Sequence, residues 1–532
     1  MSKNWILILF GLSGMAALIY EITWIRPLSL VFGTTIYAVS TIIASFIFGL
    51  AVGSWLAGRF SDRLKFPLKY FAFIQFGIGV YGLFLLPIFS FLPGTYLELY
   101  KLTFPNQPLF ILTQFLMAFG LISIPATLMG TTLPILMKSY SEKFSAIGKD
   151  VGKLDASNSM GAMFGTLFAG FLMIPLLGIQ NTIIITALIN TGIGASVLLS
   201  KKYVKIQYVA IVIVVLIPIF LFVPIYDHQL MNYGMFFEKD TKLEMQEVME
   251  YIEKEEILFY KESMYSTIMV LDDGNIRMIS INSRVQCDTS KATVKGLHQL
   301  ASIPFELFEY NYDKPKNALN VGLGCGITTK WLSDKTETTT VEIDPVIVEG
   351  SKLIVGELNT NLIIDDARNW LLRNEVQFDI IATEPSDPFT NQGTLFTQEF
   401  FSLLKSKLTD NGLLSQWVPV YEMTLYDLQV FYNTFHSVFP YVYIYQMEES
   451  YDAQLVFIGS QKKLDLNQSD LYVTSYEKLP DVITILNTDD KPSIEFSSGM
   501  NIYDLYKDNE KIKKWLRTDK NNSTQSSSEN LS

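Results

Sequence analysis

The first 226 residues consist of long apolar runs separated by short polar loops. A helix that crosses a bilayer needs about 20 mostly apolar residues. Seven runs approach or exceed this length: Trp5–Ile25, Ile36–Leu56, Leu68–Phe91, Leu109–Met137, Ser157–Leu177, Thr182–Leu199 and Tyr203–Tyr226. Glycines recur four residues apart within them, as in Gly49/Gly53 and Gly161/Gly165, a spacing that lets helices approach closely. The pattern predicts a multi-pass α-helical membrane domain over residues 1–226.

After residue 226 the apolar runs become short. Residues 227–256 form a charged connector, with a helix expected at Lys242–Glu256. Three alternating runs, Ile257–Tyr260, Ser266–Leu271 and Asn275–Ile281, surround a turn at Asp272-Asp273-Gly274. Alternation with a glycine turn is typical of antiparallel hairpins, so residues 257–316 are expected to form a small β-rich subdomain and a linker helix.

From Asn317 onward the pattern is strand, turn and helix in repetition. The expected strands are Ala318–Gly322, Thr338–Ile343, Leu362–Ile364, Phe378–Ala382, Gly412–Val418, Val442–Tyr445 and Gln454–Ile458. Such alternation predicts a mostly parallel, doubly wound α/β sheet over residues 317–517. Residues 518–532 are rich in Asn, Ser and Thr and are expected to form a disordered tail.

Charge divides the chain at the same place. Of 41 Lys+Arg and 53 Asp+Glu, 14 and 6 lie up to Tyr226, which leaves 27 and 47 for the remainder. The strongly acidic second half argues against nucleic acid as a partner, because phosphate binding requires an excess of basic residues. Two cysteines and three scattered histidines are too few for a disulfide framework or a zinc site, so no metal is expected.

Loop charges predict the orientation of the membrane domain. The N-terminus and the second, fourth and sixth loops carry twelve Lys and Arg, whereas the opposite loops carry only Arg26 and Lys101. Basic loops stay in the cytoplasm, so the N-terminus is expected there. Seven crossings then place the second half of the chain outside, although no disulfide or other extracellular adaptation is visible in the sequence.

One acidic residue, Glu21, lies within the apolar half, near the end of the first run. A carboxylate buried in a membrane is functional by default. The alternative is an interfacial pair with Arg26, five residues further along the chain. Both interpretations remain open at this point.

Polar motifs follow successive strands of the predicted sheet. The first strand leads into a glycine turn with Gly322, Gly324 and Gly326, a turn type that lets the backbone approach a nucleotide. The second ends in Glu342 and Asp344, where an acid accepts hydrogen bonds from ribose hydroxyls. The third ends in Asp365 and Asp366, where an acid can accept from an adenine amino group. These carboxyl ends meet at one edge of the sheet, so together they predict a site for an adenosine-containing ligand; helix capping is the alternative role for each acid.

The fourth strand ends in two carboxylates three residues apart, Glu384 and Asp387. Such a pair can hold an ammonium group and remove its proton before the amine attacks an electrophilic carbon.

These motifs resemble those of the spermidine synthases (polyamine aminopropyltransferases), in particular the membrane-fused type. The similar stretches are Tyr265–Ile268, Val285-Gln286, Gly322–Gly326, Val341–Pro345, Asp365–Ala367, Glu384–Pro388 and Gln416–Val418, within residues 256–460. The resemblance implies a Rossmann-like fold of the S-adenosylmethionine-dependent methyltransferase type. It also implies transfer of an aminopropyl group from decarboxylated S-adenosylmethionine to an amine, with release of methylthioadenosine.

The resemblance also implies residue roles. Gln286, Glu342 and Asp366 correspond to residues that hold the thioether-adenosine part of the donor. Glu384 stands at the position of the general base and Asp387 at that of the acid that binds the amine. Gln416, together with Tyr421 as a looser match, corresponds to residues that line the amine pocket.

Three departures concern the amine end of the site. The family carries an Asp where this chain has Cys325, an Asp where it has Glu384, and a Tyr-His-Glu run where it has Gly296-Leu297-His298. The Asp at the first position helps to hold the aminopropyl ammonium, so intact S-adenosylmethionine and a methyl or aminocarboxypropyl transfer remain an alternative. A transporter or sensor with a regulatory nucleotide domain is a second alternative. Cys325 is interpreted as a small residue of the turn. The expected partners are the bilayer, a small or lipid-borne amine acceptor and, as one alternative, a second copy of the chain.

Overall fold

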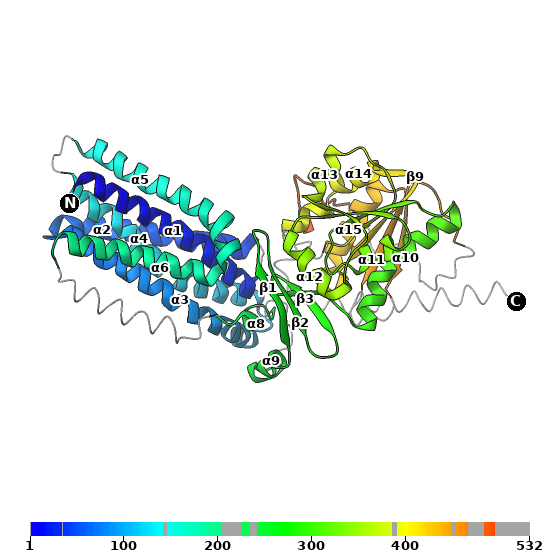
Figure 1. Cartoon of the computed structure of the whole chain (residues 1–532), viewed down its shortest axis with the longest axis horizontal. Coiled ribbons are helices and arrows are strands. Elements are labelled where there is room, and N and C mark those ends of the chain that lie inside the picture. Colours follow the sequence, from blue (N-terminus) through cyan, green and yellow to red (C-terminus); the bar gives the residue numbers. More distant parts are fainter. Residues whose placement is uncertain are drawn as a thin grey trace. The chain divides into compact units, whose positions relative to one another are not determined.

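The computed structural model describes residues 2–33, 36–141, 146–203, 226–234, 242–385, 391–447, 454–466 and 484–494 (Figure 1). The chain divides into two compact units. The first contains residues 1–253 with the short segments Lys261–Met264 and Asn282–Arg284, and the second contains the remainder.

The first unit is a bundle of long helices: α1 (Lys3–Phe32), α2 (Ile36–Phe60), α3 (Pro67–Thr103), α4 (Gln107–Tyr140), α5 (Ile147–Phe168) and α6 (Ile174–Ser200). Within the described residues, five helical stretches are long and apolar enough to cross a membrane when residues 147–200 are counted as one. The first four predicted spans fall within α1 to α4, and the sixth falls within α6. The fifth, Ser157–Leu177, runs from α5 through residues 169–173 into the start of α6. The seventh, Tyr203–Tyr226, lies almost wholly outside the described residues.

Glycines lie where the helices of the bundle pack most closely. A Cβ atom added to Gly161 of α5 would lie 1.8 Å from the Gly11 carbonyl oxygen of α1, and one added to Gly53 of α2 would lie 2.0 Å from the Thr127 carbonyl of α4. Real Cβ atoms do not approach backbone oxygens so closely, so any larger residue would push these helices apart. The predicted close approach at Gly49/Gly53 and Gly161/Gly165 is therefore confirmed.

The helix α6 is broken at Gly178, within the uncharged stretch between the fifth and sixth predicted spans. Gly178 has a φ of 78°, and a short π-helical turn (Ala169–Met173) precedes α6. The break leaves the Ile179 amide without a helical acceptor, and the buried Glu262 carboxylate of the same unit accepts its hydrogen. Arg26, the proposed partner of Glu21, donates to the Met264 carbonyl at 2.8 Å. The role of Glu21 stays a prediction.

Two short helices, α8 (His228–Met231) and α9 (Met245–Ile252), lie in the connector, and α9 falls within the expected helix. A four-stranded sheet follows, in the order β1 (Glu256–Glu262), β2 (Thr267–Asp272), β3 (Arg277–Ile281) and β4 (Arg284–Asp288). Asp272-Asp273-Gly274 forms the expected turn, in which the Gly274 amide donates to the Asp272 carboxylate at 2.8 Å. The linker helix is α10 (Lys291–Asn311).

A seven-stranded sheet dominates the second unit. Its strands are β5 (Asn317–Val321), β6 (Glu337–Glu342), β7 (Asn361–Ile364), β8 (Phe378–Thr383), β9 (Leu408–Val418), β10 (Tyr441–Gln446) and β11 (Leu455–Ser460), arranged β10-β11-β9-β8-β5-β6-β7. Six strands of this sheet run in the same direction, and β11 alone runs in the opposite direction. All seven predicted strands are therefore present. β5, the first strand of this sheet in the sequence, lies in the interior of the sheet. The strands β6 and β7 continue on one side of β5 and β8 and β9 on the other, so the strand order reverses at β5, where nucleotides bind in such sheets.

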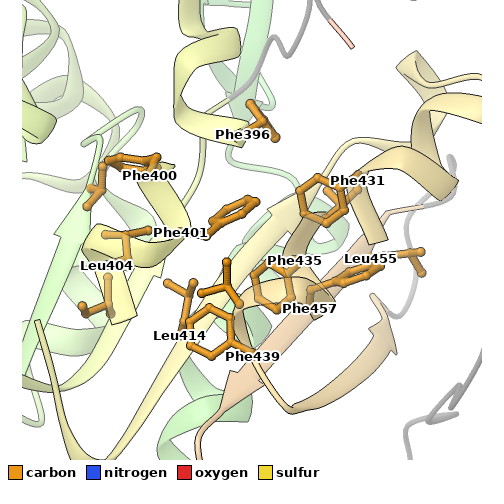
Figure 2. Packing of buried hydrophobic residues seen from close by; sticks show 14 of the residues in the cluster. Phe396, Phe400, Phe401, Leu404, Leu414, Phe431, Phe435, Phe439, Leu455 and Phe457 are labelled. Carbon is orange, nitrogen blue, oxygen red and sulfur yellow. The ribbon is translucent and has the colours of Figure 1, made fainter. Parts of the chain in front are cut away.

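Helices cover both faces of the sheet because its strands are apolar on both sides. On β8, Ile380 and Ala382 face α10, whereas Ile381 faces α14 (Gln398–Ser406) and α15 (Leu425–Val438). Figure 2 shows the second face, where phenylalanines from α14, α15 and β11 interlock. The rings of Phe401 and Phe435 meet edge to face at 5.1 Å. Each buried Phe contributes roughly 1.5–3 kcal/mol, and this packing makes β8 and β9 rigid supports for the residues at their carboxyl ends.

Candidate active site

The glycine turn connects β5 to α11 (Ile327–Ser333) and forms one wall of the site. Gly322, Gly324 and Gly326 have φ values of 85°, 51° and 83°, which other residues adopt only with strain. A Cβ atom at Gly322 or Gly324 would meet nothing within 4 Å, whereas one at Gly326 would lie 2.9 Å from Val355. The first two glycines thus leave open space above the loop for a ligand, and the third allows close packing beneath it.

Glu342, the last residue of β6, holds this turn in place. Its carboxylate accepts hydrogen bonds from the Leu323 amide at 2.8 Å and from the Asp344 amide at 2.9 Å. The side chain is buried, and burial raises the pKa of its carboxyl. The carboxylate oxygens carry further lone pairs, and binding of ribose hydroxyls by Glu342 stays a prediction.

The neighbouring acid Asp344 is engaged differently. It begins α12 (Pro345–Val355), and one of its oxygens accepts from the Val346 amide at 3.0 Å. The other accepts from the Ser266 hydroxyl at 2.6 Å. Asp344 is buried and joins β2 to α12, so the geometry favours a capping role over the predicted contact with the donor.

The two acids after β7 are more exposed. Asp366 begins α13 (Ala367–Arg373), and one of its oxygens accepts from the Asn369 amide at 2.8 Å. Asp365 accepts from the Asp366 amide and pairs with Arg373. Binding of an adenine amino group by these residues stays a prediction.

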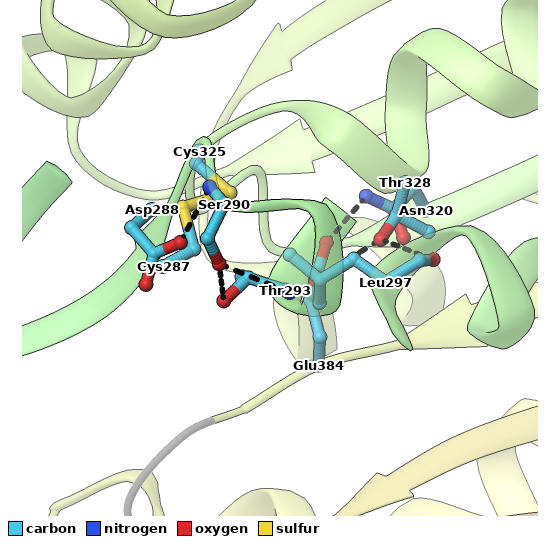
Figure 3. Close-up of a disulfide and its surroundings, with 9 residues drawn as sticks. All are labelled: Cys287, Asp288, Ser290, Thr293, Leu297, Asn320, Cys325, Thr328 and Glu384. Carbon is cyan, nitrogen blue, oxygen red and sulfur yellow. Dashed lines mark hydrogen bonds between the residues drawn. A yellow bond between two sulfur atoms is a disulfide. The ribbon is translucent and has the colours of Figure 1, made fainter. Parts of the chain in front are cut away.

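Glu384 follows β8 directly and turns toward β5 and α11. Its oxygens accept hydrogen bonds from the Asn320 amide group at 3.1 Å and from the Thr328 hydroxyl at 3.2 Å (Figure 3). Burial raises the pKa of Glu384 to about 8, with a smaller contribution from the negative charge of Glu342. Its partner in the predicted pair, Asp387, lies outside the described residues.

The predicted amine pocket lies at the end of β9. Gln416 pairs in register with Thr383, the residue before Glu384. The Gln416 side chain is buried, accepts from the Thr383 hydroxyl and donates to the Trp417 carbonyl at 2.9 Å. The ring of Tyr421 lies 6.4 Å from that of Trp417. Gln416 lies near the end of strand β9, and Tyr421 follows that end by three residues. The side-chain amide of Gln416 forms its hydrogen bonds with Thr383 and Trp417.

The two cysteines are bonded to each other, which was not predicted from the sequence. Cys325 of the glycine turn forms a disulfide with Cys287 of β4, 38 residues earlier, and both side chains are buried. The interpretation of Cys325 as merely a small turn residue, and the statement that no disulfide is visible, were therefore wrong. The bond ties the turn to the residue after Gln286, whose side chain is partly exposed. It brings two elements of the predicted donor site together (Figure 3).

Two residues of the site were missed from the sequence. Asn320 and Thr328 contact the Glu384 carboxylate, yet neither belongs to a motif discussed above. Asn320 offered a signal, because it is a polar residue within the apolar strand Asn317–Val321. Thr328 offered none. Across the described part of the chain, no group of three His, Cys, Asp or Glu residues is placed to hold a metal ion.

Comparison with known proteins supports the resemblance. Residues 300–489 match the family model described as "Spermine/spermidine synthase domain". A polyamine aminopropyltransferase of Oceanobacillus iheyensis is 23% identical over 420 residues, covering 76% of this chain and 75% of the relative. One from Corynebacterium efficiens is 24% identical over 438 residues, covering 77% of each chain. These matches are too long for the second half alone, so they extend into the helical half.

Among solved structures, spermidine synthase from Thermotoga maritima is 17% identical and covers 45% of this chain and 84% of that one, with a TM-score of 0.34. The family match and the relatives confirm that the second half carries a spermidine synthase domain.

Proposed function

We propose that this chain is a membrane-anchored aminopropyltransferase that moves the aminopropyl group of decarboxylated S-adenosylmethionine to a polyamine-like amine. The observation that carries the proposal is Glu384, a half-buried carboxylate at the end of β8 beside the glycine turn. It lies within a domain that matches the spermidine synthases, and its position is that of the general base implied by the motifs.

Donor binding and proton transfer are carried out by different residues of the site. Gly322 and Gly324 leave room for the adenosyl donor, and Glu342 binds its ribose hydroxyls. An amine attacks the carbon next to the sulfonium only as the free base, because an ammonium has no lone pair. The new C–N bond forms as the C–S bond breaks, the sulfonium becomes the thioether of methylthioadenosine, and the surplus proton of the amine passes to Glu384. A pKa of about 8 suits this step, because a general base works best when its pKa lies near the working pH.

One observation favours a second candidate function. Cys325 stands where the family carries the acid that holds the aminopropyl ammonium, and its sulfur is joined to Cys287, so it carries no charge. The donor site therefore lacks one carboxylate that would repel the carboxylate of intact S-adenosylmethionine. A methyl or aminocarboxypropyl transferase that uses the intact donor is the alternative.

Product analysis distinguishes these functions. The purified full-length protein is incubated with isotope-labelled decarboxylated or intact donor and a panel of diamines. We expect methylthioadenosine from the decarboxylated donor only. S-adenosylhomocysteine from the intact donor would show methyl transfer, and methylthioadenosine from the intact donor would show aminocarboxypropyl transfer. Binding of a donor without turnover of either would support the sensor interpretation and contradict an enzyme.

In this proposal the N-terminus is cytoplasmic and the catalytic half lies outside the cell membrane. The support is the excess of basic residues in alternate loops, twelve to two, together with seven apolar runs. The Cys287–Cys325 disulfide adds to it, because disulfides persist in oxidising compartments and are rare in the cytosol. An outward domain requires an exported donor and an exported or lipid-delivered amine.

Labelling of a C-terminal cysteine tag in intact cells tests this orientation. The native cysteines are joined to each other, so a signal reports the added cysteine. We expect a membrane-impermeant maleimide to label the C-terminal tag before lysis, and an N-terminal tag only after lysis. Protection of the C-terminal tag until lysis would contradict the outward model and imply an even number of crossings.

A further inference from the structure

We infer that Thr328 and Asn320 are positioning residues that hold the Glu384 carboxylate for proton transfer. Thr328 forms a hydrogen bond with the Glu384 carboxyl group in both its charged and its neutral form. The inference rests on the proposed function, in which Glu384 is the base. It goes further because neither residue belongs to the motifs that carry the resemblance, and because it explains how a longer acid is held where the family has Asp.

The two contacts come from different elements and reach different oxygens. Asn320 of β5 donates to one Glu384 oxygen at 3.1 Å, and Thr328 of α11 lies 3.2 Å from the other. Glu has one more rotatable bond than Asp, so its carboxylate can swing further from the strand that carries it. Two donors on opposite oxygens fix the plane and the depth of the carboxylate, which a single donor cannot do.

The orientation of Asn320 is fixed independently of Glu384. Its Nδ2 group lies 2.8 Å from the Gly322 carbonyl oxygen, which can only accept, so the nitrogen rather than the oxygen must face this side. Its second hydrogen faces both the Thr329 hydroxyl at 2.9 Å and the Glu384 carboxylate at 3.1 Å, and the charged oxygen is the stronger acceptor. Asn320 is fully buried and therefore a rigid donor. It favours the charged form of Glu384.

Thr328 differs because its hydroxyl both donates and accepts. It lies 3.2 Å from the Glu384 carboxylate and 3.4 Å from the Leu297 carbonyl oxygen (Figure 3). With Glu384 charged, the single hydroxyl hydrogen points to the carboxylate. With Glu384 protonated, Thr328 can accept the new O–H and turn its own hydrogen to Leu297. The hydroxyl is thus satisfied before and after proton transfer, and no buried group loses its partner.

The electrostatic surroundings define the expected effect. Burial raises the pKa of Glu384, Glu342 of β6 raises it further, and the hydrogen bonds from Asn320 and Thr328 lower it. Loss of either donor should therefore raise it further. Since the base acts only when deprotonated, the rising limb of the pH profile of kcat/KM should move to higher pH.

The experiment compares Thr328→Val, Thr328→Ser and native enzyme across the pH range. For the valine variant we expect the limb to shift up by about one pH unit, the size of one hydrogen bond to a charged group. Below the limb kcat/KM should fall about tenfold, and above the shifted limb it should return to near the native value. Thr328→Ser, which keeps the hydroxyl, should restore the native limb. Asn320→Leu should shift the limb in the same direction.

Thr340→Val is the matched control. Thr340 is as fully buried as Thr328 and bonds the Thr329 and Thr360 hydroxyls, so its loss removes a buried hydroxyl of the same type without removing a contact to Glu384. A limb that stays in place in Thr328→Val, or moves equally in Thr340→Val, would overturn the inference. If the limb is absent from the native profile, or Glu384→Gln remains within tenfold of native turnover, the assignment of the base fails and the inference fails with it.

Discussion

Replacement of Glu384 by Gln should lower turnover by about 10²–10⁴-fold while donor binding stays nearly intact. General-base assistance contributes rate factors of this size, and a base acts on the amine rather than on the donor. Gln keeps the length of the side chain. Its carbonyl oxygen can accept from Asn320 and its amide group can donate to the Thr328 hydroxyl, so the fold should survive. The measurements are kcat from methylthioadenosine release at saturating substrates and donor affinity from calorimetry.

A control variant tests whether the loss of turnover depends on where the negative charge is removed. Glu357→Gln removes one acid from the exposed Glu357–Lys352 pair in the same unit and should leave kcat unchanged. Turnover of Glu384→Gln within tenfold of native would mean that another group is the base or that the reaction needs none. Asp387 would then be the first residue to test.

Replacement of Glu342 by Gln should weaken binding of the adenosyl donor by about 1.5–3 kcal/mol, the size of a hydrogen bond to a charged group. The native carboxylate already fixes the glycine turn through the Leu323 amide and the next turn through the Asp344 amide. A neutral amide has one acceptor oxygen for both, so the variant loses a backbone contact as well as an acceptor for the ribose.

Calorimetry with the decarboxylated donor measures this effect. Glu337→Gln is the matched control, because Glu337 begins the same strand and is exposed. It should bind the donor as the native protein does. Affinity of Glu342→Gln equal to that of the control would remove Glu342 from the donor site, even if the glycine turn were loosened.

The amino-acid sequence determined most of the elements and their order, although β4 was not expected. The six apolar runs that lie within the described residues are helical, and all seven strands expected after Asn317 are in the sheet, because the hydrophobic period is a local property of the chain. The glycine positions were equally readable. Gly322, Gly324 and Gly326 have positive φ values, and Gly53 and Gly161 lie at close helix contacts, since glycine tolerates both conditions with the least strain.

The strand ends were also predictable, because parallel strands place their carboxyl ends at one edge of a sheet. Glu342 and Glu384 were found in this way. Which of the acids would face a ligand was not predictable. Asp344 follows the same strand as Glu342, yet its two oxygens bind Val346 and Ser266, and the second contact spans 78 residues of sequence.

Only the tertiary structure decided the contacts that join distant segments. Cys287 and Cys325 come together because the small sheet packs beside the glycine turn in one apolar cluster, a fact that their spacing in the sequence does not contain. Asn320 and Thr328 reach Glu384 because β5 lies next to β8 in the sheet. Periodicity records which side of an element is apolar, whereas partners across a sheet depend on strand order and register, which packing of the whole domain determines.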